Sequence, residues 1–221
     1  MATPSRIQAP QIDRIQLGEL RDGDPDDLER NTDLEGVQYD GIRDGELDLG
    51  GGSLISQCSF RDLVVDELGL ASSRIRETRF DRVATSVLKM ARTNLMDVEF
   101  SGGRLGAIEA YDLRCKAVHF NGVKINYLNL RGAELVDVLF TDCIIDDLDL
   151  SQTKAMRVRL TGTRIGNLNV RDSKLTNVDL RGARIETVTG PFALAGAVLS
   201  SQQVVDLAPA MAREVGIIVA D

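Results

Sequence analysis

Apolar residues recur at every fifth position through most of the chain. From Phe60 to Ile185, the middle residue of each five-residue unit is apolar, with Thr85 as the one exception. Five of the six phenylalanines also lie 20 residues apart, at Phe60, Phe80, Phe100, Phe120 and Phe140. A fixed period of this length indicates a chain built by stacking one structural unit.

Each five-residue unit predicts a short strand followed by a turn. The position two before the middle carries no charge between Cys58 and Ala183, so each unit has two inward side chains around one outward side chain. Its last residue is often Gly, Asp or Asn, which suit tight turns. Four units then close one square coil. A period of five excludes a helix, whose turn has about 3.6 residues, and turn signals at every unit exclude an ordinary sandwich.

The five-residue repeat, which we call the lattice, divides the chain into three parts. Residues 32–192 predict an all-β solenoid of about eight coils, with Gln57 as one extra residue between the first coils and the main register. Residues 1–31 are expected to form an acidic N-terminal cap of extended chain with one helical turn, which begins at Asp24 and Pro25. Residues 193–221 abandon the lattice and predict a short C-terminal helical cap.

The C-terminal segment has its own signals. Ser201 can cap a helix that Pro209 should break or kink and that Gly216 should end. Its apolar stripe comprises Val204, Leu207, Ala208, Met211 and Val215. We expect this stripe either to seal the last coil or to leave apolar surface for a second subunit.

The repeat resembles the pentapeptide repeat family, in which a small or apolar residue, any residue, Leu or Phe, and two polar residues follow one another. The run VEFSG GRLGA IEAYD LRCKA from Val98 to Ala117 carries this pattern, although Val or Leu fills many first positions. The resemblance implies a right-handed quadrilateral β-helix. The segments QQVVDLAPAMAREVGI and LNLRGAELVDVLF resemble a subgroup that is common in high-GC Gram-positive bacteria and has no assigned function. Some family members dimerise through their C-terminal ends.

The net charge of −8 is unevenly distributed. Residues 1–57 hold 5 basic and 13 acidic residues, residues 58–192 hold 20 and 18, and residues 193–221 hold 1 and 3. The main lattice is therefore nearly neutral, and the acidity lies at the ends. The chain has no run of 18 apolar residues, and its start has no apolar signal segment. We expect a cytoplasmic protein that neither enters a membrane nor binds nucleic acid directly.

The residue types that most often form catalytic or ligand-binding sites do not cluster in this sequence. Cys58, Cys115 and Cys143 all fall on inward positions and are expected to be small core residues in a reducing compartment. His119 is the only histidine and falls on an outward position, where we expect a solvated side chain. Gly50 to Ser53 predicts a turn, because it lacks the Lys and helix of a phosphate cradle. We expect no catalytic, cofactor-binding or metal site, no cofactor and no enzymatic activity.

Two segments are candidates for contact with a partner. Asp142, Asp146, Asp147 and Asp149 are outward carboxylates on adjacent units, and they predict either a site for a basic partner or a cation or ordinary solvated positions. Val83 to Arg92 contains the polar Thr85 and predicts a local bulge or altered turn, which could mark a contact site.

These features favour a non-enzymatic interaction or scaffold protein that binds an unidentified protein through its walls or ends. The resemblance offers an alternative, because some pentapeptide repeat proteins mimic duplex DNA, bind DNA gyrase and protect it from quinolones. Such mimicry needs a continuous acidic stripe in place of the phosphates. Residues 58–192 do not supply this stripe, whereas the acidic first coils could supply a short one.

Overall fold

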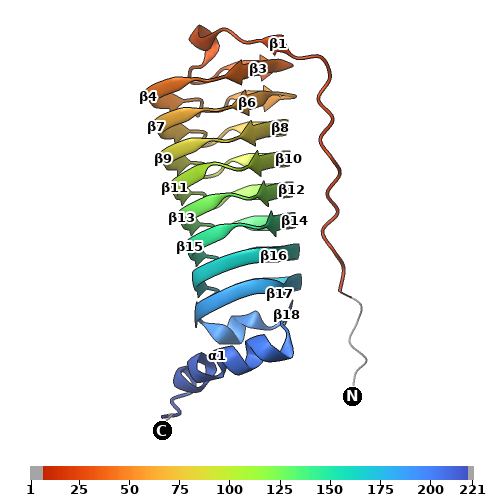
Figure 1. The fold of residues 1–221 in the computed structure, drawn as a ribbon, viewed down its shortest axis with the longest axis vertical. Helices are drawn as coiled ribbons and strands as arrows, with labels where there is room; N and C mark the ends of the chain where they lie inside the picture. Colours follow the sequence, from red (N-terminus) through yellow and green to blue (C-terminus); the bar gives the residue numbers. More distant parts are fainter. Residues whose placement is uncertain (1–6, 219–221) are drawn as a thin grey trace.

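The chain forms a parallel β-solenoid of about nine turns, closed by one α-helix at its C-terminal end. This computed structural model describes residues 7–218, and Figure 1 shows the coils stacked in sequence order. Every coil contributes strands to a single 18-stranded sheet whose pairs are all parallel. The solenoid predicted from the five-residue lattice is confirmed.

The coil has four faces, which we number by the residues that fill them. Face one contains Phe100, face two Leu105, face three Ala110 and face four Leu95. Faces two and three are formed by β4 (Arg43–Asp48), β7 (Val64–Gly69), β9 (Ala84–Lys89), β11 (Arg104–Glu109), β13 (Lys124–Asn129) and β15 (Ile144–Asp149). Faces four and one are formed by β2 (Asp33–Glu35), β3 (Val37–Asp40), β5 (Leu54–Ser56), β6 (Ser59–Arg61), β8 (Arg74–Asp81), β10 (Asn94–Ser101), β12 (Arg114–Asn121) and β14 (Glu134–Thr141).

The last strands turn corners without interruption. β16 (Lys154–Asn169) and β17 (Lys174–Thr189) each run through all four faces. The solenoid pairing also extends past the limits expected from the lattice. β1 (Arg21–Asp22) pairs with β3 at one end, and β18 (Ala197–Val198) pairs with β17 at the other.

A constant register from coil to coil sets the core. Phe100 pairs with Phe80 in the coil before it and with Phe120 in the coil after it. Because the pairing repeats, identical side chains lie on one another, and Tyr39 continues the column of five phenylalanines in the first coil. Neighbouring rings have centroids 4.8 to 5.4 Å apart and planes within 13° of parallel. This spacing matches both the separation of paired strands, about 4.8 Å, and the range that aromatic rings prefer.

The extra residue lies in the glycine turn, so the prediction that placed it at Gln57 was wrong. Asp33 pairs with Leu54, and Leu54 pairs with Arg74, so the coil that begins at Asp33 is one position longer than the coil that begins at Leu54. Gly51 and Gly52 absorb the insertion, with φ of 79° and 112°, which only glycine adopts freely. The expectation of a turn at Gly50 to Ser53 is confirmed.

The expected bulge around Thr85 is absent. Thr85 stays in register, paired with Val65 on one side and Leu105 on the other. Its side chain is buried, and its hydroxyl donates to the carbonyl oxygens of Asp66 at 3.1 Å or Val87 at 2.9 Å. A threonine fits an inward position without distorting the strand because its hydroxyl finds a backbone acceptor.

The segment before the first coil contains the helical turn that the sequence predicts; residues 1–6 of the expected cap lie outside the described residues. The 3₁₀-helix η1 (Pro25–Asp27) begins after Asp24, whose side chain accepts a hydrogen bond from the backbone of Asp26. Gly23 lies directly against the ring of Tyr39, where a Cβ atom would overlap the ring. The cap therefore covers the end of the aromatic column.

The C-terminal cap comprises the 3₁₀-helix η2 (Pro191–Leu194) and helix α1 (Ser201–Glu214). The N-cap is Ser200 rather than Ser201, because Ser200 and Gln203 form a reciprocal capping box. The helix continues through Pro209, so the expected break is absent. Pro209 is exposed, so solvent can hydrate the carbonyl group that its ring leaves without a donor. Gly216, at φ 78°, follows the helix end as predicted.

Two substitutions of Phe100 test the column. We expect Phe100→Ala to lower the free energy of unfolding by about 3–5 kcal/mol, because it leaves a cavity between two rings. Phe100→Leu copies the leucines at positions 160 and 180 of the same column and should cost less than about 1.5 kcal/mol. Urea denaturation of both variants measures the difference, and equal losses would contradict the stacked column.

Candidate functional site

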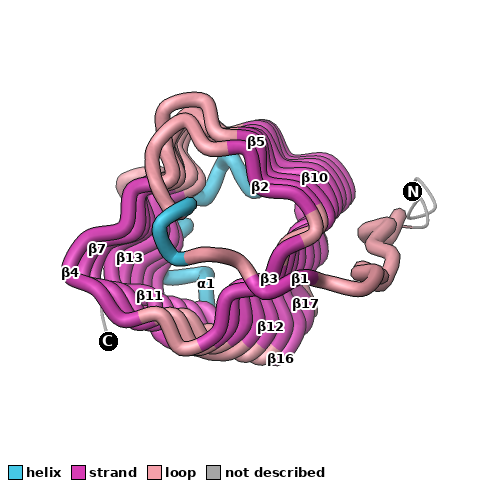
Figure 2. The backbone as a smooth tube through the Cα atoms, turned by 90° about the horizontal axis from the view of Figure 1, so that it is seen from above, coloured by secondary structure: helices cyan, strands magenta, loops and turns pink. Residues whose placement is uncertain are grey.

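An N-terminal strap, residues 7–20, lies along the outside of the solenoid. Figure 1 shows it running beside the coils for most of their length, and Figure 2 shows it outside the closed coil. Ile15 of the strap is buried, and Ile7, Pro10 and Ile12 are half-buried. The sequence predicted extended chain here, but it did not predict that this chain would occupy an outer face.

Side chains of the coils hold the strap by its backbone. The amide of Gln8 donates to Oδ1 of Asn177 at 3.2 Å, and the amide of Gln11 donates to Oδ1 of Asp137 at 2.9 Å. Farther along, the guanidinium of Arg79 donates to the carbonyl oxygen of Ile15. These contacts recognise an extended main chain and do not depend on the strap's own side chains.

Asp137 is the central anchor of the strap. Its carboxylate accepts hydrogen bonds from the Arg157 guanidinium at 2.6 and 2.7 Å, and its side chain is only 3% exposed. The bond from Arg157 holds the pKa of Asp137 below its ordinary value, and the amide of Gln11 acts in the same direction. The carboxylate is therefore ionised at neutral pH and can accept from both groups.

His119 lies beneath the strap, so the prediction of a solvated histidine was wrong. Its outward side chain lines a hollow together with Ile12, Ile15 and Leu139. Nε2 lies 3.0 Å from the Thr141 hydroxyl. Burial lowers the pKa of His119, although the nearby Glu99 opposes this effect. The sequence could not show this burial, because residues far away in the chain provide the cover.

Face two contains an open groove of about 600 Å³ around Thr85. Its floor is low because Ala84, Gly106 and Ala107 are small, and Arg104 and Tyr127 stand at its sides. Gly106 is required there, since a Cβ atom would overlap the backbone of the coil before it. The groove occurs where the sequence predicted an irregular wall, although the cause is side-chain size rather than a bulge.

Face four contains a second open groove, of about 460 Å³. Arg76 and Lys116 lie on either side of Met96, with which both pair across neighbouring strands. Leu95 and Val136 contribute to the same apolar surface. This site was not predicted from the sequence, although the equivalent outward positions of successive coils carry its signal.

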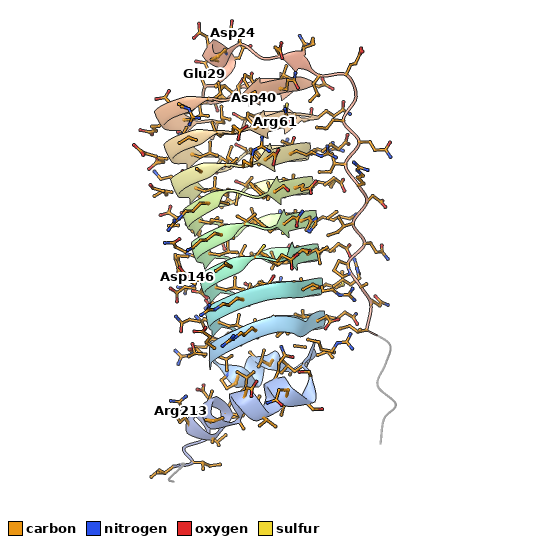
Figure 3. The ribbon with its side chains drawn as sticks, in the orientation of Figure 1. Asp24, Glu29, Asp40, Arg61, Asp146 and Arg213 are labelled. Carbon is orange, nitrogen blue, oxygen red and sulfur yellow. The ribbon has the colours of Figure 1, made fainter. Side chains whose placement is uncertain are left out.

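The four predicted aspartates do not converge. Asp147 accepts from the side-chain amide of Asn167 at 2.7 Å, and Asp149 accepts from Asn169 at 3.0 Å. Asp142 occupies a left-handed turn with φ of 52°, and Figure 3 shows Asp146 pointing away from the coils. Between residues 7 and 218, no three His, Cys, Asp or Glu side chains are grouped to hold a metal ion. Binding of a basic partner here stays a prediction.

The predicted stripe on α1 divides into two parts. Leu207 is buried, and Met211 packs against the core at its edge, so these residues close the last coil. Val204 and Val215 are 46% and 53% exposed, and Val205 and Phe192 are exposed as well. The C-terminal end therefore presents apolar side chains to solvent in addition to those that seal the core.

The interior is filled by buried apolar side chains and contains the three cysteines. Cys58, Cys115 and Cys143 are all buried thiols, as predicted, and burial raises the pKa of each, for Cys115 to about 12. A thiol with a raised pKa is a poor nucleophile at neutral pH.

In the part of the chain from 7 to 218, no helix is long and apolar enough to cross a membrane.

The comparisons with known proteins identify a distant structural likeness. No family model and no curated protein match the chain. Two trypsin-treated variants of QnrB1, a plasmid-mediated fluoroquinolone resistance protein, are similar at 11% identity. The first has a TM-score of 0.34 over 85% of this chain and 100% of that chain. The second has a TM-score of 0.32 over 83% and 99%. A likeness at this level carries no argument about function.

Replacement of the strap anchor tests its role. We expect Asp137→Ala to lower the free energy of unfolding by about 1–3 kcal/mol, because Arg157 loses its buried partner. Trypsin should then cleave after Arg14 faster than in the native protein. Asp172→Ala is the matched control, because Asp172 occupies a turn with nearly the same φ, 56° against 57°. Equal cleavage rates in both variants would contradict the anchoring role.

The same anchor predicts a pH dependence. Because the folded-state pKa of Asp137 is lowered, its contribution to stability is present above the unfolded value of about 3.9 and is lost as the pH falls through the folded value. Urea denaturation between pH 7 and pH 2.5 should therefore show a steeper acid loss for the native protein than for Asp137→Asn. Parallel curves would be the contrary result.

Proposed function

We propose that this protein is a non-enzymatic interaction protein that binds a protein partner through its outer faces or ends. The strap is the observation that carries this proposal. Asn177, Asp137 and Arg79 bond to the main chain of an extended segment over several coils, so the outer surface is able to hold polypeptide. The filled interior and the absence of a metal-binding group among residues 7–218 give no support to a catalytic role.

The exposed apolar residues of the C-terminal end support a second copy of the chain as one partner. Phe192 and Val205 are 66% and 65% exposed. Two such ends could bury these side chains against one another, and burial of apolar surface favours association. This contact would leave the faces that the strap does not cover free for another protein.

DNA mimicry with binding to DNA gyrase is the alternative function. The observation that favours it is the acidity of the N-terminal end, where Figure 3 labels Asp24, Glu29 and Asp40. Face four weakens it, because one of its columns contains the basic residues Arg74, Arg114 and Lys154. A gyrase supercoiling assay with a quinolone decides this alternative. An unchanged reaction excludes it.

Capture from the organism that encodes the chain tests the main proposal. The full-length protein should retain a specific protein, and one charge-reversed face or one end variant should lose it while the other variants keep it. This pattern is expected because a binding surface occupies only part of the rod. The proposal would be contradicted if the native protein retained no specific protein. It would also be contradicted if every variant retained the same proteins as the native protein.

Light scattering during size exclusion tests the contact between C-terminal ends. The native protein should have about twice the 24.1 kDa mass of one chain. The Phe192→Asp/Val205→Asp variant should be monomeric, because charges replace the apolar contact. Val64→Asp on face two is the control and should remain dimeric. A monomeric native protein at every concentration would exclude this contact.

A further inference from the structure

Face four carries a concentrated positive charge on a protein whose net charge is −8. In the two columns of outward side chains that begin at Arg74 and Arg76, the charged residues up to position 176 are basic with a single acidic exception, whereas the turn column beside them contains Glu77, Asp97 and Asp137. The basic residues are Arg74, Arg76, Arg114, Lys116, Lys154 and Lys174, and the acidic residue is Glu134. These side chains form two columns, because equivalent residues of successive coils pair with one another.

The column nearer the strap alternates charge with apolar surface. It runs through Arg76, Met96, Lys116, Val136 and Met156. Met96 and Met156 are 39% and 38% exposed. The groove of about 460 Å³ lies over the first four of these residues. A ligand seated there would meet cations and apolar side chains in turn.

Most of these cations have no carboxylate partner. Glu134 lies 3.7 Å from Arg114 and 3.1 Å from Lys154. Within residues 7–218, Arg74, Arg76, Lys116 and Lys174 form no ion pair with a carboxylate. Elsewhere on the rod, some charges of adjacent coils pair with one another, as Arg82 does with Asp62. Face four is therefore complementary to an acidic ligand.

The strap shows how many residues of a bound extended chain span a given number of coils. Gln8 and Gln11 bond to Asn177 and Asp137, which occupy equivalent turns two coils apart, so a step of three positions along an extended chain spans two coils. Arg76 and Lys116 are also two coils apart, at about 9.6 Å by the usual strand spacing. Positions 12, 15 and 17 of the strap face the rod, whereas positions 13 and 14 between the first two are exposed. Acidic residues three positions apart in a chain of this conformation would therefore reach both cations. An apolar residue two positions after the second acidic residue would face the rod again, next to Val136, which pairs with Lys116.

A polypeptide fits this surface better than a nucleic acid does. Single-stranded nucleic acids are held by aromatic side chains on which bases stack, and none of the outward residues of face four between 74 and 176 is aromatic. The net charge of −8 also repels a polyanion over the length of the rod. A short acidic segment contacts only the local positive surface and buries its apolar residue on Val136.

We propose that face four binds an extended acidic segment of a partner protein, with two carboxylates three positions apart and an apolar residue two positions after the second carboxylate. This inference rests on the proposed function and specifies its surface and ligand. The first carboxylate pairs with Arg76 and the second with Lys116, so that the main chain between them passes over Met96 and the apolar side chain covers Val136. Met156 extends the contact for an apolar residue that follows. The segment runs along the rod, as the strap does on the neighbouring side.

Selection from a display library of short random peptides tests this proposal. The library is selected on the full-length protein, and the enriched peptides are then measured by fluorescence anisotropy. We expect acidic residues three positions apart with an apolar residue two positions after the second. The Arg76→Glu/Lys116→Glu variant should weaken the best peptide by about tenfold or more, because two attractive pairs become repulsive. Val136→Ser should weaken it by about threefold or more through lost apolar contact.

The matched control is Lys124→Glu/Arg184→Glu, which makes the same charge change on face two and should alter the affinity by less than about twofold. Thermal unfolding of each variant confirms that it folds. Enriched peptides without acidic residues, equal effects of both double variants, or tighter binding of a short single-stranded oligonucleotide would each overturn the proposal. If the Arg76→Glu/Lys116→Glu protein still captures every cellular partner, the inference about face four fails, whereas the proposed function stands.

Discussion

Parallel backbone pairing at a fixed offset of one coil is the constraint on which the whole molecule depends. It places Phe80, Phe100 and Phe120 in one column at the spacing of paired strands. The same pairing places outward residues in columns, so that Arg76, Met96 and Lys116 become neighbours although the chain separates them by whole coils. The same register therefore packs the inward side chains into the core and aligns the outward side chains in columns on the outer faces.

The sequence predicts the parts of the structure that repeat. The five-residue lattice was sufficient for the solenoid, the inward cysteines and the limits of most coils. It failed at Gln57, because the glycine turn at Gly51 and Gly52 absorbs one residue without a change in the polarity of the pattern. The strap was not predictable from periodicity, since its seat depends on one turn column whose residues change from coil to coil, among them Asp137, Arg157 and Asn177.

Among the candidate surfaces as well, those that repeat from coil to coil could be predicted, and those that depend on distant segments could not. The groove on face four could have been found by comparing equivalent outward residues of successive coils, because its cations and methionines share two columns. The burial of His119 could not, because its cover comes from the strap, which lies far away in the chain. The predicted aspartates were placed on the surface correctly, yet the coil geometry keeps Asp142 and Asp147 at different corners. A surface of a solenoid can be predicted from equivalent residues one coil apart, and not from residues that are adjacent in the sequence.

Hydrogen–deuterium exchange of the native protein tests most directly whether the outer surface holds an extended polypeptide. If the strap is seated as described, the amides of Gln8 and Gln11 should exchange more slowly than those of a free peptide and faster than those of the coils, because their hydrogen bonds open without unfolding of the core. Asp137→Ala should bring them close to the free-peptide rate. Exchange of residues 7–20 at the free-peptide rate in the native protein would contradict this account of the outer faces.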